Sequence, residues 1–102
     1  MKSLSPRTRA LAAKAAGIFD ARGLRAYVVG GAIRDDLLGR STDDVDLVID
    51  GSPHEVGPEL ALALEGRLVS LDVPRDMVRI VIPSGLSTVY IDLAKMVGDT
   101  ID

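Results

Sequence analysis

The sequence predicts an α/β (α+β) domain with a mixed, mostly antiparallel sheet and helices packed chiefly on one face. Segments of helical and strand character alternate through the first two thirds of the chain, which indicates helices covering a sheet. Three strand-like runs then follow one another, which argues against a purely parallel sheet. The length of 102 residues, with 47% hydrophobic and 26% charged side chains, is ordinary for one globular domain.

The beginning of the chain is expected to form a helix and then a strand. Residues 5–22 should be helical, because Ser5 can cap the first turn and Pro6 suits the first helical position. Gly23 is expected to end this helix, since glycine readily takes the left-handed backbone found there. Residues 25–29 combine a β-branched pair with a tyrosine, which indicates a strand.

A glycine pair separates this strand from the next elements. Gly30 and Gly31 are expected to break the strand, and residues 32–38 are expected to form a short helix that Gly39 ends. Residues 44–50 at first alternate acidic and apolar side chains, which indicates a second strand.

The remaining chain is expected to contain one helix and three consecutive strands. The helix should open at residues 51–53 and run to about Glu65, with Gly66 as its stop. Pro58 indicates an irregular first turn, so the regular helix is expected to begin near that residue. The strand-like runs are 67–72, 77–82 and 87–94, the last two joined by the turn residues 83–85. The expected order is α-β-α-β-α-β-β-β.

Composition and charge exclude several classes of protein. The absence of cysteine excludes a disulfide framework and a thiolate metal site, and it fits a reducing compartment, so we expect a cytoplasmic location. No apolar run approaches the length of a membrane span, so no membrane contact is expected. Residues 1–25 carry six Lys or Arg and one acid, whereas the rest carries six and fourteen. The acidic region is unlike a surface that grips nucleic acid, so either a cation sits among its carboxylates or nucleic acid binds elsewhere.

Two carboxylates of the second strand form the sharpest pattern. Alternation along a strand makes Asp44 and Asp46 project together, roughly 7 Å apart, while Val45 and Leu47 fill the opposite side. Such a pair repels itself by about 2 kcal/mol at a surface-like dielectric. A divalent cation reverses the sign of that interaction, and oxygen-only ligands suit Mg²⁺. The alternative is a strand with an acidic, hydrated outer face. Asp43 is assigned to the preceding loop.

The glycine pair is a second, weaker pattern. Gly30 and Gly31 leave a strand and enter the expected helix, whose N-terminus would offer free N–H groups to a phosphate. Arg34, in the first helical turn, could donate two hydrogen bonds to the same phosphate. The alternative is a tight turn with Arg34 paired to a surface acid. Together, a phosphate site and two nearby carboxylates indicate metal-assisted triphosphate chemistry.

Residues 28–49 (VVGGAIRDDLLGRSTDDVDLVI) resemble the head-domain signature of class II tRNA nucleotidyltransferases (CCA-adding enzymes) and bacterial poly(A) polymerases, within the DNA polymerase beta superfamily. The shared pattern is a hydrophobic strand, Gly-Gly-x-x-Arg-Asp, a Leu-Leu-Gly-Arg turn and a strand bearing Asp-x-Asp. A weaker similarity continues through residues 75–80 and 90–94. The resemblance implies a palm-like head over residues 1–102 that transfers a nucleotide from CTP or ATP to the 3′ end of RNA, in tRNA CCA addition or polyadenylation.

The resemblance also implies roles for individual residues. Asp44 and Asp46 would bind two Mg²⁺ ions, and Asp92 is the candidate for a third carboxylate that helps to activate the attacking hydroxyl. The alternative for Asp92 is a surface residue of an edge strand. The residues implied in triphosphate binding are Gly30, Gly31, Arg34 and Asp35, the last of which would orient Arg34.

The chain is expected to be an N-terminal fragment of such an enzyme. In the resembling family a ribose-handling segment, a helical neck and RNA-binding domains follow the head, so weak or no transfer activity is expected from this chain alone. The tRNA 3′ end would be bound through those other regions, and self-association of the interrupted domain is a further expectation. The choice between adding C, A or both is left open.

Two other readings of the sequence stay open. One is a stand-alone minimal nucleotidyltransferase, although such enzymes usually carry Gly-Ser where this chain has Gly-Gly. The other is a non-catalytic nucleotide- or protein-binding module with the same fold. Among the other polar residues, His54 is expected in solvent, and Arg79 is expected to face away from the core, with its role in the site left open.

Overall fold

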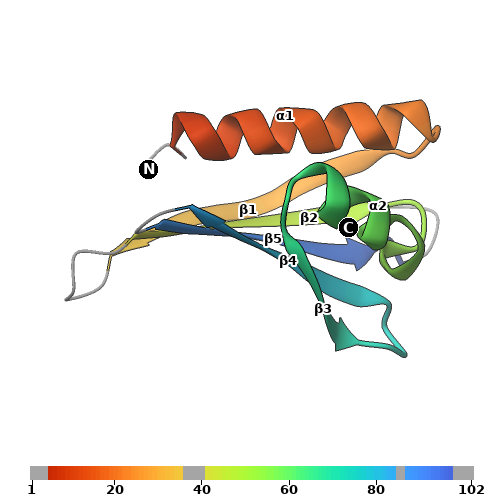
Figure 1. Ribbon diagram of the computed structural model, residues 1–102. Coiled ribbons are helices and arrows are strands. Elements are labelled where there is room, and N and C mark those ends of the chain that lie inside the picture. Colours follow the sequence, from red (N-terminus) through yellow and green to blue (C-terminus); the bar gives the residue numbers. More distant parts are fainter. Residues whose placement is uncertain (1–4, 36–40, 85–86, 98–102) are drawn as a thin grey trace.

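The computed structural model describes residues 5–35, 41–84 and 87–97, except for the side chains of residues 31–35, 41, 42 and 84. Across these residues, a pair of helices lies over one face of a five-stranded sheet (Figure 1). The elements are α1 (Pro6–Ala21), β1 (Ala26–Asp35), β2 (Ser41–Ile49), α2 (Pro53–Ala63), β3 (Arg67–Asp72), β4 (Met77–Ser84) and β5 (Ser87–Lys95). Neither described helix is long and apolar enough to cross a membrane.

The sheet has the strand order β1-β2-β5-β4-β3. Only β2 and β5 are parallel, and the other three neighbouring pairs are antiparallel. This confirms the predicted mixed, mostly antiparallel sheet. The two strands that carry the candidate carboxylates, β2 and β5, lie side by side in the middle of the sheet, so Asp92 does not lie on an edge strand.

The core lies between the two helices and the sheet face beneath them (Figure 1). Strand alternation supplies it with an unbroken apolar layer, because every second residue of the central strands points toward the helices. Burying each such side chain contributes about 1.5–3 kcal/mol. The members from the sheet are Val45, Leu47, Ile49, Val78, Ile80, Ile82, Val89, Ile91 and Leu93. The apolar positions Val45, Leu47 and Ile49 of β2 are used on this side, which leaves its acidic positions 44 and 46 for the helix-free face.

The first helix forms as its sequence predicts. The Ser5 hydroxyl accepts a hydrogen bond from the backbone N–H of Thr8 at 3.2 Å, and Pro6 occupies the first helical position. Gly23 follows the helix with φ of 71°, the left-handed conformation expected of a closing glycine. Phe19, which is fully buried, anchors the helix in the core.

The expected short helix over residues 32–38 is wrong where the structure describes it. Residues up to Asp35 continue β1, and Ala32 and Arg34 pair across the ladder with Asp44 and Thr42. The antiparallel partner strand pairs with the backbone groups that face it, and that tertiary pairing overrides the local helical pattern. Residues 36–38 lie outside the described residues. The observed order is therefore α-β-β-α-β-β-β.

The second helix also differs from its predicted start and stop. It is regular from Pro53, and the exposed Pro58 lies inside it, so no irregular first turn precedes residue 58. The left-handed residue after the helix is Glu65, with φ of 57°, and not Gly66. Gly66 meets a different need: a Cβ there would lie 2.9 Å from the carbonyl oxygen of Val81 on β4. The absence of a side chain at Gly66 thus allows the connection from α2 to β3 to pass close to β4.

Candidate active site on the helix-free sheet face

The helix-free face of the sheet carries the predicted carboxylate pair. Val45 and Leu47 are buried beneath the helices, whereas Asp44 is half-buried and Asp46 exposed on the other side. The alternation that predicted a shared face for Asp44 and Asp46 is therefore confirmed. Because both described helices cover the opposite face, neither of them blocks access to these carboxylates.

The parallel pairing of β2 and β5 brings a third carboxylate to the pair. Asp92 is the register partner of Asp46, and Tyr90 is the partner of Asp44. Paired positions on adjacent strands share a face, so Asp92 lies directly beside Asp46. The structure thus brings together the three aspartates that the sequence proposed.

Crowding of these carboxylates acts on the protonation of Asp46. Partial burial, and then the negative charges of Asp92 and Asp44, raise the pKa of Asp46 above its ordinary value, while Arg79 opposes the shift. A raised carboxylate pKa means that the ionised form is disfavoured by its surroundings. A cation beside Asp46 would favour this ionised form.

Arg79 of β4 is the cation that faces this cluster. It is the register partner of Asp92, and its Nε and Nη2 donate to Asp92 Oδ1 and Oδ2 at 2.8 and 3.0 Å. Its guanidinium also stacks on the ring of Tyr90, 4.7 Å from the ring centroid. The prediction that Arg79 faces away from the core is confirmed. The sequence did not indicate its two hydrogen bonds to Asp92.

The donor set suits a magnesium ion, although it is not arranged around one. The adjacent carboxylates offer only oxygen, which is the ligand that Mg²⁺ prefers. Among the described residues, however, no group of three or more His, Asp or Glu side chains converges closely enough to hold a metal. Asp92 is turned toward Arg79 by its two hydrogen bonds.

The glycine pair lies beside the carboxylates in a strand and not at a helix start. Gly30 pairs with Asp46 directly after a bulge in β1, and a Cβ on Gly30 would lie 3.3 Å from Asp46 Oδ2. Arg34 and Asp35 belong to the same strand, and their side chains are not among those described. The expected helix N-terminus is therefore wrong, because β1 continues through this segment, whereas phosphate binding by these residues stays a prediction. Glycine at position 30 still leaves space next to Asp46.

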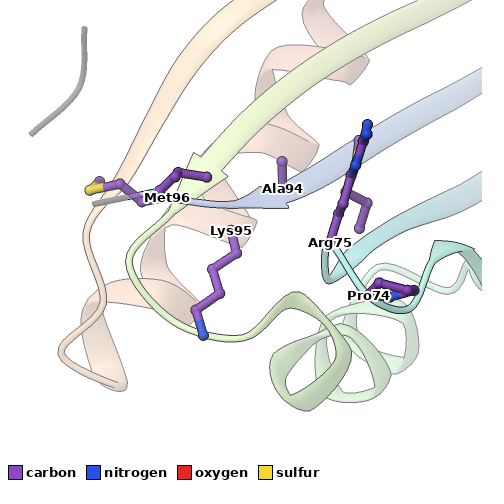
Figure 2. Close-up of a pocket in the computed structure, with 7 residues that line it drawn as sticks. Pro74, Arg75, Ala94, Lys95 and Met96 are labelled. Atoms are coloured by element: carbon purple, nitrogen blue, oxygen red, sulfur yellow. The ribbon is translucent and has the colours of Figure 1, made fainter. Parts of the chain in front are cut away.

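One hollow borders the carboxylates, and a second hollow lies next to it. A hollow of about 240 Å³ is bordered by Asp46 and Asp92 and by apolar residues of β1, β2, β4 and β5. A larger hollow of about 550 Å³ lies between the end of β5 and the turn from β3 to β4 (Figure 2). Both include Met77 and Ala94, so they are neighbours on the molecule. A substrate held at the aspartates would have an apolar surface beside it.

Asp43 has a role that the sequence did not reveal. It belongs to β2 and not to a loop, it is only 6% exposed, and it points toward the helices. Its Oδ2 accepts hydrogen bonds from the Ser5 hydroxyl at 2.8 Å, from the Ser5 N–H at 3.3 Å and from the buried Thr8 hydroxyl. Asp43 therefore ties the start of α1 to the sheet, and it does not belong to the candidate metal site.

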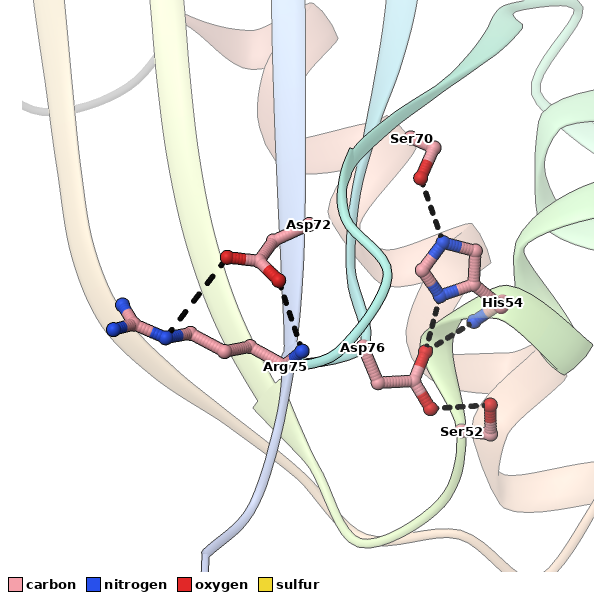
Figure 3. A network of polar contacts seen from close by, with 6 residues as sticks. All are labelled: Ser52, His54, Ser70, Asp72, Arg75 and Asp76. Atoms are coloured by element: carbon pink, nitrogen blue, oxygen red, sulfur yellow. Dashed lines mark hydrogen bonds and ion pairs between the residues drawn. The ribbon is translucent and has the colours of Figure 1, made fainter.

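The sequence suggested that His54 lies free in solvent, and this prediction is wrong. Its Nδ1 and its backbone N–H both contact Asp76 Oδ1, and its Nε2 lies 2.8 Å from the Ser70 hydroxyl (Figure 3). The Ser52 hydroxyl donates to the other oxygen of Asp76. The network fixes the turn between β3 and β4 to the start of α2. No sequence signal could have found it, since Asp76 lies 22 residues beyond His54.

Known proteins resemble this chain in sequence and fold. Residues 26–96 match the family model described as the poly(A) polymerase head domain. A CC-adding tRNA nucleotidyltransferase of Shouchella clausii is 54% identical over 43 residues, which are 42% of this chain and 11% of that enzyme.

Two solved structures share the fold. A structure described as a tRNA-processing enzyme (apo form I) has a TM-score of 0.66 and 28% identity over 92% of this chain. A tRNA nucleotidyltransferase complexed with a primer tRNA and an incoming ATP analog has a TM-score of 0.55 and 31% identity over 84% of this chain. The chain spans 24% of each of these two proteins. Because the family match covers well over half of the sequence, the chain belongs to the poly(A) polymerase head domain family.

Proposed function

We propose that this chain is the head of a nucleotidyltransferase that transfers a nucleotide from CTP or ATP to the 3′ end of a tRNA. The observation that carries the proposal is the juxtaposition of Asp44, Asp46 and Asp92 on the helix-free face. The family membership and the relative solved with a primer tRNA and an ATP analog support it. The regions of such an enzyme that select the base and bind the tRNA would lie outside this chain.

The proposed reaction uses the carboxylates in two ways. Asp44 and Asp46 would hold Mg²⁺, which neutralises phosphate charge and makes the attacking 3′-hydroxyl more acidic. Asp92 would help to orient that hydroxyl and to take up its proton. The hydroxyl oxygen forms a bond to the α-phosphorus, and the bond from that phosphorus to the β-phosphate oxygen breaks, so pyrophosphate leaves.

The triphosphate is proposed to lie along β1. Gly30 and Gly31 would let it approach the backbone closely, and Gly30 already faces Asp46 across the ladder. Arg34 would contact a phosphate as a two-pronged donor, with Asp35 orienting it. A phosphate at this position would be next to the carboxylates that hold the cation.

Titration calorimetry with a non-hydrolysable CTP or ATP analog tests this proposal on the chain itself. We expect binding in the presence of Mg²⁺ that falls at least about tenfold without it, because a cation must screen the carboxylates from the phosphates. Asp44→Ala should abolish the Mg²⁺-dependent component, whereas Asp20→Ala, on the exposed face of α1, should leave it unchanged.

Binding that ignores both Mg²⁺ and Asp44 would contradict the proposed site. Mg²⁺-dependent binding that is never followed by transfer, even after the chain replaces the head of an active relative, would favour a non-catalytic binding module.

A further inference from the structure

Arg79 is held in place from two sides on the candidate active-site face. Its fork of donors meets both oxygens of Asp92, and Tyr90, two residues earlier on β5, stacks against its guanidinium. A two-pronged Arg–carboxylate pair is among the strongest charge-assisted contacts and has a defined geometry. The side chains of Arg79 and Asp92 are 37% and 22% exposed, so water screens the pair only incompletely.

This contact sets Asp92 apart from Asp46. Asp46 lies directly beside Asp92 in the sheet, yet the two-point contact of Arg79 is with Asp92. The orientation of Asp92 toward β4 is consistent with the lack of a converging three-ligand group among the described residues. Arg79 thus binds Asp92, the carboxylate nearest in the sheet to a cation bound at Asp46.

We propose that Arg79 is a positioning residue that competes with the divalent cation for Asp92. Arg79 keeps this carboxylate hydrogen-bonded until the cation is bound at Asp44 and Asp46. The inference rests on the proposed function of the same site. In the cation-free chain Arg79 balances the charge of Asp92. When the cation arrives, Asp92 gives up hydrogen bonds to Arg79 and turns toward Asp46, and the released guanidinium becomes available to an anionic substrate.

A double-mutant cycle of Mn²⁺ affinity tests the competition, with Mn²⁺ as a paramagnetic substitute for Mg²⁺. Arg79→Gln should bind Mn²⁺ about tenfold more tightly than the unaltered chain, as coupled neighbours allow. In the Asp92→Asn background the same change should have only about a twofold effect, because the competed carboxylate is gone. Arg79→Lys keeps the positive charge but not the two-pronged donor group. Its Mn²⁺ affinity should lie between those of the unaltered chain and Arg79→Gln. Arg75→Gln, on the exposed β3–β4 turn, controls for the loss of one positive charge.

A second readout follows the contact itself. In the nitrogen-15 NMR spectrum, the Arg79 Nε–H signal should shift as Mg²⁺ is added, and it should stay fixed when Mg²⁺ is added to Asp46→Asn. An equal effect of Arg79→Gln with and without Asp92 would show plain charge repulsion and overturn the competition. Weaker Mn²⁺ binding by Arg79→Gln would overturn it too. If the unaltered chain binds no Mn²⁺ through Asp44 and Asp46, the proposed function itself fails.

Discussion

Replacing Asp46 by asparagine is expected to abolish divalent cation binding and to stabilise the cation-free fold. The amide has the shape of the carboxylate but no charge, so cation affinity should fall by at least about 100-fold. The same change removes a partly buried charge and its repulsion from Asp92 and Asp44, which together raise the pKa of Asp46. We expect a gain of about 0.5–1 kcal/mol in the free energy of unfolding, kept small because Asp46 is exposed and water screens the repulsion.

The pH dependence of this gain has a definite sign. Because the folded pKa of Asp46 is raised, its ionisation disfavours the folded state, and the cost is fully present only above the folded pKa. The advantage of Asp46→Asn should therefore be present at pH 7 and vanish as the pH falls below about 3.9, where the carboxyl is protonated folded or unfolded. Chemical denaturation at several pH values measures it, with Asp20→Asn as the matched control. A variant that loses both cation binding and stability would point to a structural role for Asp46.

Replacing Asp43 by alanine is expected to cause the largest loss of stability. The change removes a buried acceptor of three hydrogen bonds and leaves the fully buried Thr8 hydroxyl without that partner. We expect the free energy of unfolding to fall by about 3 kcal/mol, a large share of the stability of a domain this small. Urea denaturation should show the loss, and Asp20→Ala should change stability by less than about 0.5 kcal/mol.

The effect of Asp43 depends on pH in the opposite sense to that of Asp46. Burial pushes its pKa up, but hydrogen bonds from Thr8 and Ser5 outweigh burial and hold the pKa below its ordinary value. Its stabilisation is therefore present above about pH 3.9 and is lost as the pH falls through the lower folded pKa. The difference between the unaltered chain and Asp43→Ala should stay constant from about pH 7 to about pH 5 and shrink only in stronger acid. A difference that shrinks already near neutrality would contradict this account of Asp43.

The features that could be predicted from the sequence are those fixed by local periodicity. The two-residue repeat of β2 placed Asp44 and Asp46 together on one face and Val45 on the other, and the structure confirms both placements. The caps of α1 were equally readable, because Ser5, Pro6 and Gly23 act within a few residues of the helix ends.

The features that escaped prediction depend on pairing between distant segments. A local pattern after Gly31 suggested a helix, but the partner strand β2 keeps this segment extended. The hydrogen bonds of Asp43 reach back 35 and 38 residues, to Thr8 and Ser5. The parallel register that sets Asp92 beside Asp46 joins strands separated by α2, β3 and β4. Only the family resemblance, and no spacing rule, suggested Asp92.

The location of a bound Mn²⁺ ion decides whether the cation site lies on the helix-free face of the sheet. Mn²⁺ broadens the NMR signals of nearby nuclei, so substoichiometric Mn²⁺ added to the nitrogen-15-labelled chain marks its binding site residue by residue. We predict that the amide signals of residues 44–46 and 91–93 disappear first, that those of α1 persist, and that Asp46→Asn prevents the effect. Broadening centred on the Asp72–Asp76 turn, or a pattern that Asp46→Asn leaves unchanged, would contradict a cation site on the helix-free face.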